Sequence, residues 1–263
     1  MSVVGKVDSL WRYPVKSMRG EDLEEAFVGF SGIYGDRLFA FSSTASPKGF
    51  PYFTAREQKE MLRYRPRFRH ATRAAQPINW VDAMRLAPGV TPLYADLAEL
   101  IVDVETPTGE VLAIDDPALI PLLAAGIDGK HELTLLRSER ALTDCRPVSL
   151  FSIQTAKALG NELGIEVDKR RFRANIYLDL EAEKGFGEDA FVGRTLRIGS
   201  RVTVSVIERD PRCKMVTLDP DTAESNPKIL RAVAQGHDNM AGVFGAVLVE
   251  GIIKSGDLIE LLD

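Results

Sequence analysis

Short stretches of alternating apolar and polar residues, separated by glycine-containing turns, recur along this chain and limit the folds open to it. Residues 201–208 (Arg-Val-Thr-Val-Ser-Val-Ile-Glu) are the clearest case, because a period of two places every second side chain on one face of a strand. The same reasoning predicts strands at 3–13, 25–31, 36–43, 67–75, 81–86, 99–106, 110–114, 243–250 and 257–262. The chain is therefore predicted to be β-dominated and barrel-like in both of its parts.

A few helices are expected among these strands, each marked by residues that suit a helix terminus. Asp, Ser and Asn are favoured at N-caps, proline in the first turn and glycine just after the last one. On these signals, helices are predicted over 117–126, 152–163 and 226–236.

Length and composition fit one large globular domain or two smaller ones. The chain has 263 residues, of which 45% are hydrophobic and 27% are charged, which is enough to bury a sizeable core. Near residue 127 the sequence turns to Gly-Ile-Asp-Gly-Lys-His, which suits a boundary. We predict an N-terminal domain over 1–126 and a C-terminal domain over 127–263, with a soft boundary across which segments can interleave.

Charge and hydropathy argue against several function classes. The net charge of −5 is opposite to the basic footprint of nucleic-acid binding. No apolar run approaches the ~20 residues that span a bilayer, and the start of the chain has no signal-peptide pattern, so a cytoplasmic location away from membranes is expected. The histidines are isolated, and no nucleophile elbow, Walker loop or dinucleotide glycine pattern occurs.

Positive charge is nevertheless clustered at 63–69, where four arginines alternate with aromatic or proline residues, and at 169–171 (Lys-Arg-Arg). Such clusters can focus the electrostatic potential on a small anionic ligand or an acidic partner protein. A solvated strand face explains the 63–69 run equally well. The sequence leaves both interpretations open.

Cys213 is one of only two cysteines, and it follows the strand predicted at 201–208. Residues 209–213 are therefore expected to leave the sheet as a loop that displays the thiol at a rim. Flanking cations would favour the thiolate, which attacks electrophiles or ligates metals, whereas a small buried hydrophobe is the alternative. Two cysteines are too few for an iron–sulfur cluster, which usually takes four.

The residues around Cys213 resemble a known family. Arg212-Cys213, followed by Thr-Leu-Asp-Pro-Asp-Thr at 217–222, is similar to the signature of the MOSC family, the domains related to the C-terminal part of molybdenum cofactor sulfurase. Residues 13–17 (Tyr-Pro-Val-Lys-Ser) and 35–37 (Gly-Asp-Arg) resemble the N-terminal barrel domain that accompanies MOSC in the amidoxime-reducing-component branch. Further blocks match in order at 54–58, 172–176 and 256–257.

This resemblance implies a fold and a cofactor. The implied fold is a β-dominated α+β one, with a small N-terminal β-barrel domain and then a MOSC β-barrel with flanking helices. The implied cofactor is molybdenum–molybdopterin, with Cys213 as metal ligand and catalytic residue. The residues expected at the cofactor are Lys16, Ser17, Arg56, Ser149, Arg173, Asn175 and Arg212. Because arginine binds phosphate through a planar fork, Arg56 or Arg173 is expected to matter more for cofactor retention than Lys16.

The resemblance also implies an activity, namely reduction of N-hydroxylated or N-oxide substrates with electrons from a separate iron–sulfur, flavin or cytochrome protein. The resemblance fits a bacterial protein. It is also compatible with pyridoxal phosphate binding, a property ascribed to MOSC domains. One alternative is a cofactor or sulfur carrier in which Cys213 holds a persulfide without reductase turnover. Another is a noncatalytic domain that has lost the metal.

Each implied cofactor residue has a plainer interpretation. Lys16 and Ser17 could form the polar end of a strand, and Arg56 could cap or salt-bridge a nearby helix. Arg173 and Asn175 could simply face solvent from an apolar strand.

Other residues near the family blocks are given structural interpretations. The acidic pair in 219–221 is expected to form an Asx turn, and Ser152 could cap a helix rather than bind phosphate. Cys145 is interpreted as incidental. Asp210 stands where many relatives have a second cysteine, and Ala174 stands where many have proline.

Overall fold

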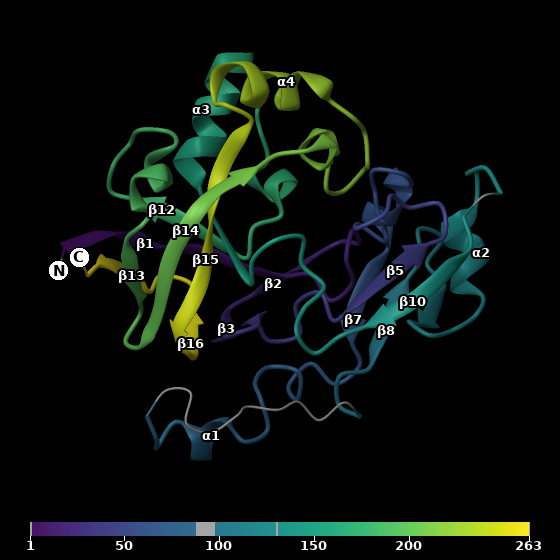
Figure 1. Cartoon of the computed structure of the whole chain (residues 1–263), viewed down its shortest axis with the longest axis horizontal. Coiled ribbons are helices and arrows are strands. Elements are labelled where there is room, and N and C mark those ends of the chain that lie inside the picture. The colour runs from purple at the N-terminus through teal and green to yellow at the C-terminus, as the bar shows by residue number, and fades with distance from the viewer. Residues whose placement is uncertain (1, 88–97, 130, 263) are drawn as a thin grey trace.

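A closed barrel of seven strands forms the centre of the molecule (Figure 1). The computed structural model describes residues 2–87, 98–129 and 131–262. Around the barrel the order is β12 (Ile176–Leu180), β11 (Val148–Ser152), β15 (Met240–Val249), β14 (Val202–Pro211), β13 (Thr195–Ile198), β17 (Leu258–Leu261) and β1 (Ser2–Arg12). Pairing of β1 with β12 closes the ring, and β2 (Glu21–Leu23) extends from β1. The contact between β11 and β12 is parallel, and the other pairings around the ring are antiparallel.

Apolar side chains fill the barrel, because alternate residues of each strand point inward. Val204 and Ile259 from the C-terminal half meet Val7 and Leu10 of β1 in one buried cluster. Removing such a side chain from water stabilises the fold by about 2 kcal/mol each. The N-terminal strand is thus an integral part of a barrel whose other strands come from the C-terminal half.

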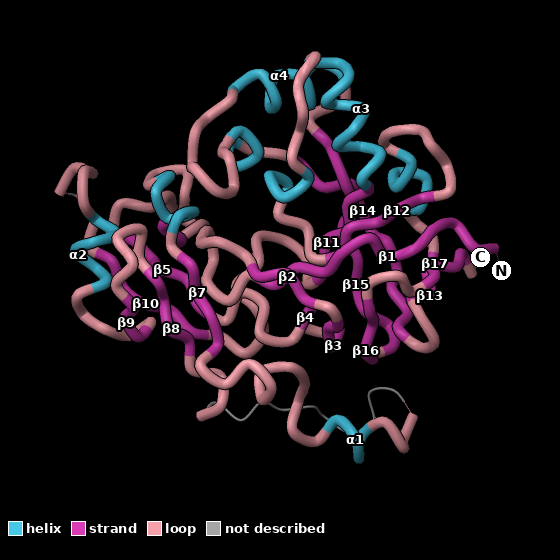
Figure 2. The backbone as a smooth tube through the Cα atoms, turned by 180° about the vertical axis from the view of Figure 1, so that it is seen from behind, coloured by secondary structure: helices cyan, strands magenta, loops and turns pink. Residues whose placement is uncertain are grey.

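Three small sheets lie beside the barrel (Figure 2). They are β10–β5–β6 (Leu133–Arg137, Phe39–Ser43, Tyr52–Phe53), β7–β8–β9 (Arg65–Phe68, Val102–Glu105, Val111–Ala113) and β16–β3–β4 (Gly251–Lys254, Glu25–Gly29, Gly32–Ile33). The first two sheets share a core with α2 (Leu119–Ala124) and the 3-10 helix η1 (Lys59–Arg63). They form the small β-rich unit that the N-terminal half was expected to make.

Two longer helices pack against the barrel. α3 (Ile153–Leu163) starts at Ser152, whose hydroxyl accepts from the Thr155 amide, and it ends at Gly164 in the left-handed conformation with φ 64°. α4 (Pro227–Gly236) starts at Asn226, whose side chain accepts from the Lys228 amide. Both helices are confirmed as predicted from their caps. Three short 3-10 helices, η2 (Lys169–Phe172), η3 (Gly187–Phe191) and η4 (Lys214–Thr217), complete the described elements.

The β-dominated fold class with flanking helices is confirmed, but three strand predictions need correction. Residues 81–86 are not a strand, because α1 (Trp80–Ala83) forms there and Trp80 packs on Phe27 with ring centroids 4.8 Å apart. β7 ends at Phe68 instead of reaching residue 75, since the paired part of β8 stops there. β14 runs on to Pro211, which still pairs with Met240, so the sheet ends later than expected.

The arginine run at 63–69 is a solvated strand face. Arg65 and Arg67 are exposed on β7, while Pro66 and Phe68 between and beside them are buried. Arg65 and Arg69 pair with acidic residues of the neighbouring strand β8. The four arginines of this run do not line the cavity of the candidate site. The domain division at residues 126 and 127 stays a prediction.

Candidate active site

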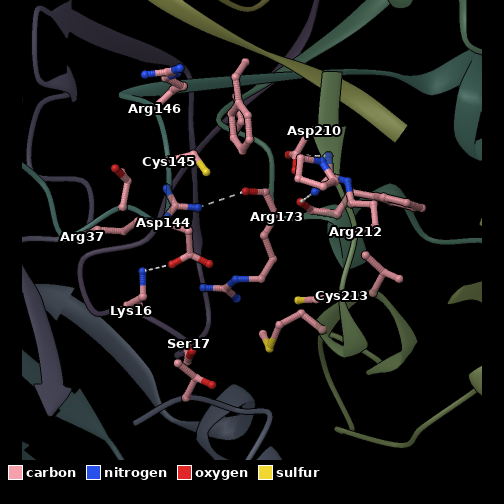
Figure 3. A pocket seen from close by; sticks show the side chains of 18 of the residues that line it. Lys16, Ser17, Arg37, Asp144, Cys145, Arg146, Arg173, Asp210, Arg212 and Cys213 are labelled. Atoms are coloured by element: carbon pink, nitrogen blue, oxygen red, sulfur yellow. Dashed lines mark hydrogen bonds and ion pairs between the residues drawn. The ribbon is translucent and has the colours of Figure 1, made fainter. Parts of the chain in front are cut away.

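A cavity of about 360 Å³ lies where the end of β14 faces the N-terminal unit and the loop 138–147 (Figure 3). It collects residues from several segments that are distant in the sequence. All eight residues expected at the cofactor line it: Lys16, Ser17, Arg56, Ser149, Arg173, Asn175, Arg212 and Cys213. Most of the sequence blocks that carry the resemblance therefore converge on one place in the fold, whereas 256–257 lies elsewhere.

Cys213 is the second residue after Pro211, where β14 ends, and it precedes the 3-10 helix η4. It is half-buried, and its sulfur points into the cavity (Figure 3). The expected cationic surroundings are largely engaged elsewhere: Arg209 pairs with Asp189 and Asp238, and the Lys214 ammonium donates to a backbone carbonyl. The rim position of the thiol is thus as expected, whereas an activating ring of free flanking cations is not present among the described residues.

Arg212 connects neighbouring elements in the cavity wall through its guanidinium group. Its Nε donates to the Ala241 carbonyl at 2.6 Å, its Nη1 donates to the Phe172 carbonyl at 2.9 Å, and Nη2 lies 2.7 Å from Asp210 Oδ2. These contacts tie β14 to β15 and to the end of η2. They fix the backbone immediately before Cys213.

Asp210 is the buried acidic partner of Arg212. Burial raises the pKa of its carboxyl from 3.8 to about 6, and the Arg212 charge opposes this rise. Between about pH 4 and pH 6, the Asp210 carboxyl is therefore protonated in the folded state and ionised in the unfolded state. A raised acid pKa makes the fold more stable as the pH falls through this window.

We expect the free energy of unfolding to gain roughly 3 kcal/mol from Asp210 between pH 7 and pH 4. Urea denaturation of wild type and Asp210→Asn across this range isolates the contribution, because other titrating groups act in both proteins. The stability difference between the two proteins should change in favour of wild type as the pH falls. A difference that stays constant with pH would contradict the argument.

Lys16 is buried in the turn after β1 rather than exposed at a strand end. Its side chain is 6% exposed, and its ammonium contacts Asp144 and donates to the Leu142 carbonyl at 2.7 Å. The ammonium also lies 4.4 Å from the ring centroid of Tyr52. Burial lowers the Lys16 pKa, while Asp144 acts in the opposite direction. The polar-strand-end interpretation is therefore wrong for Lys16.

Arg173 differs from the other arginines of the cavity because its charge is buried and has no carboxylate partner among the described residues. Its Nη2 is buried with no hydrogen-bond acceptor, and its guanidinium lies 4.2 Å from the Tyr13 ring centroid. Burial lowers the Arg173 pKa to about 10 despite the opposing effect of Tyr13. Such an orphaned donor is costly unless a ligand supplies an acceptor.

Arg56 is the second cation of the cavity lining without a carboxylate partner among the described residues. Its Nε donates to the Thr54 hydroxyl at 3.1 Å, and its guanidinium stacks 4.3 Å from the Phe50 ring centroid. It neither caps nor salt-bridges η1, whose cap is Gln58. Two fixed guanidinium groups thus face the cavity ready to bind an anion.

Ser149 and Asn175 brace each other. The Ser149 hydroxyl donates to Asn175 Oδ1 at 3.1 Å and accepts from the Asn175 backbone N–H. The Asn175 side-chain Nδ2 donates to the Trp11 carbonyl. Asn175 is 1% exposed, so the solvent-facing interpretation is wrong for it. The pair positions the backbone that carries Arg173 rather than leaving two free polar groups.

Ser152 does not contribute to the cavity. The N-terminus of α3 is occupied by the fully buried Glu188, whose carboxylate accepts from the Ser152 amide and hydroxyl and from the Thr155 hydroxyl. A carboxylate already satisfies this helix terminus. The expected Asx turn at 219–221 is confirmed, since Asp219 Oδ1 accepts from the amides of Asp221 and Thr222.

Two family models match the chain and together account for most of it. The model described as the MOSC domain matches residues 137–260, and the one described as the MOSC N-terminal beta barrel domain matches residues 4–105. The chain belongs to the MOSC family. No curated protein matches this MOSC chain significantly.

Solved structures with a similar fold include three bacterial proteins. YuaD from Bacillus subtilis shares 12% identity and a TM-score of 0.48, with 98% of this chain and 95% of that chain covered. YiiM from Geobacillus stearothermophilus shares 19% identity and a TM-score of 0.35, with 44% and 54% covered. YiiM from Escherichia coli shares 14% identity and a TM-score of 0.33, with 45% and 55% covered. The chain thus spans about half the length of the YiiM structures.

The residues of this MOSC protein fit the cofactor that the family binds. Among the described residues, seven basic and two acidic side chains line the cavity. The orphaned Arg173 Nη2 suits a phosphate oxygen, and the Cys213 sulfur, which points into the same cavity, has the soft character that suits the metal. No cluster of three or more histidine, cysteine or acidic residues that could hold another metal occurs in the described ranges.

Sequence reasoning missed several residues of this MOSC cavity. Arg37 was within a matched block but was not assigned to the site, and it donates to the Arg173 carbonyl at 3.2 Å. Asp144 and Cys145 line the cavity from the loop 138–147, so Cys145 is not remote from the site. Their signal was present in the family-like stretch before Pro147. Across the described residues, no helix has the length and apolar character needed to cross a lipid bilayer.

Proposed function

We propose that this protein binds a molybdenum–pterin cofactor in the cavity and reduces N-hydroxylated or N-oxide substrates. One observation carries the proposal: a single cavity is lined by the Cys213 thiol and by Arg173, whose buried Nη2 has no hydrogen-bond acceptor. The cation suits the cofactor's phosphate, and the thiol suits the metal. When bound, the cofactor would supply a two-electron centre that accepts oxygen.

The chain's own residues would hold and shield this centre. Arg173 and Arg56 would bind the phosphate, Ser149 and Asn175 would keep the Arg173 backbone in place, and Cys213 would ligate the metal. The balanced reaction takes an N-hydroxylated compound, two electrons and two protons to the amine or amidine and water. The electrons would come from a separate redox protein of the iron–sulfur, flavin or cytochrome type.

We expect near-stoichiometric molybdenum and pterin in wild-type protein made in a host with ample cofactor, and loss of most molybdenum in Cys213→Ala. Cys145→Ala is the matched control, because it removes the chain's other thiol from the same cavity. Molybdenum is measured by elemental analysis and pterin by the fluorescence of its oxidised form. Wild-type protein should also turn over an aromatic N-hydroxyamidine with a chemically reduced viologen dye, whereas Cys213→Ala should not.

Two results would overturn the proposal. Equal molybdenum loss in both cysteine variants would remove Cys213 as the specific ligand. Wild-type protein that holds neither molybdenum nor pterin would end the reductase assignment. Labile sulfane sulfur on Cys213 in that case would favour the persulfide carrier, which is the alternative function of the same thiol.

A further inference from the structure

The Lys16 ammonium is already neutralised by the chain itself. Asp144 Oδ1 contacts Lys16 Nζ, and the Leu142 carbonyl accepts from the same ammonium. Both carbonyl and carboxylate come from the loop 138–147, which contains no helix or strand and follows β10. A carboxylate therefore occupies the position on Lys16 that an incoming anion would need.

The two partners differ in how firmly they are held. Lys16 is 6% exposed, with its amide bonded to the Phe39 carbonyl and its ammonium beside the Tyr52 ring. The Asp144 side chain is 53% exposed and belongs to an irregular loop. Asp144 can move into water with little change in its surroundings, because about half of its side chain is already exposed. Lys16 has no comparable route to solvent.

We propose that Asp144 is an internal counter-ion that occupies Lys16 until a phosphate group displaces it, and that it thereby lowers the affinity of this cavity for phosphate. The inference rests on the proposed function only in that the cavity binds a phosphate-bearing cofactor. It needs neither molybdenum nor turnover. Asp144 tunes anion affinity in this scheme, and it does not touch the reacting atoms.

Charge accounts for the effect. Any anion that binds Lys16 must first displace Asp144, and this displacement lowers the affinity of each of them. A phosphate dianion can also meet the unpartnered Arg173 and Arg56, which favour its binding. The internal carboxylate thus lowers the affinity for every anion that uses Lys16.

The test measures binding of inorganic phosphate and of acetate to cofactor-free full-length protein by calorimetry at pH 7.5. Asp144→Asn keeps the shape of the side chain and removes its charge. We expect phosphate to bind this variant about tenfold more tightly than it binds wild type, and acetate, which carries a smaller charge, to gain less. In a Lys16→Met background the same Asp144→Asn change should alter phosphate affinity by less than about twofold.

Glu208→Gln is the matched control. Glu208 pairs with Arg146 at 2.8 Å, and Arg146 lines the same cavity, but the pair is exposed on both sides. Removing this carboxylate should change phosphate affinity by less than about twofold, because its field is screened by water. A tenfold gain in Glu208→Gln would show that general charge, rather than occupation of Lys16, controls binding.

The outcomes separate this inference from the proposed function. Phosphate binding that is equal in wild type and Asp144→Asn overturns the counter-ion role and leaves the cofactor site intact. A gain that persists in the Lys16→Met background also overturns it. If neither protein binds phosphate, the anion site itself is absent and both proposals fail. Lack of molybdenum in wild type with a tenfold gain in Asp144→Asn contradicts the reductase alone.

Discussion

Replacement of Arg173 by methionine is expected to weaken phosphate binding about thirtyfold and, at the same time, to raise the free energy of unfolding by about 1 kcal/mol. The two effects have one cause. The buried Arg173 Nη2 has no acceptor in the described structure, and burial lowers the pKa of its guanidinium to about 10. Methionine removes this unsatisfied charge from the fold and removes the donor that a phosphate would use. The lost contact with the Tyr13 ring reduces the gain in stability but does not reverse it.

Calorimetry with inorganic phosphate and urea denaturation of the cofactor-free protein give the two measurements. Lys16→Met is the comparison, and its loss of phosphate affinity should be smaller because Asp144 already neutralises Lys16. This ordering also tests the expectation that an arginine fork matters more than a lysine here. A stability decrease in Arg173→Met would show that the guanidinium is satisfied in solution, and the orphaned-donor argument would then be wrong.

Replacement of Arg12 by methionine is expected to have the opposite effect on stability, a loss of about 3 kcal/mol. Arg12 is deeply buried, with its side chain 4% exposed, but its donors are satisfied. Nε donates to Glu21 at 2.7 Å, and Nη1 donates to the carbonyls of Tyr34 and Ala74. Removal leaves these acceptors without a donor and ends the link between β1, β2 and the N-terminal unit.

Urea denaturation again measures the change, and Arg12→Lys serves as the control. Lysine keeps the positive charge near Glu21 but cannot reach three acceptors at once, so an intermediate loss is expected. Because Arg12 lies outside the cavity lining, phosphate affinity of the folded Arg12→Met protein should stay within about twofold of wild type. A loss below about 1 kcal/mol would contradict the view that these hydrogen bonds hold the two units together.

Local capping signals predicted the helices. The site was predicted from sequence motifs. Ser152 and Gly164 bound α3, and Asn226 with Pro227 starts α4, because caps are set by the residues at the terminus itself. The eight site residues converge on one cavity although they are spread from Lys16 to Cys213. That convergence came from the family resemblance, since composition and periodicity do not report distances between remote segments.

The missed features depend on contacts between distant parts of the chain. Glu188 fills the N-terminus of α3 from a separate segment, so Ser152 alone could not show that the terminus was taken. The occupation of Lys16 by Asp144 joins residues more than a hundred positions apart. α1 was mistaken for a strand because its short apolar stretch has no periodicity long enough to separate the two.

Closure of the barrel by β1 has a consequence for how the protein is made. β1 pairs with β17 at the other end of the chain, with Ser2 opposite Leu261. β1 must therefore wait, with one edge open, until β17 has been synthesised. Such long-range closure slows folding and exposes a nascent chain to aggregation. Synthesis speed and chaperone supply, rather than final stability, should set the yield of this protein in cells.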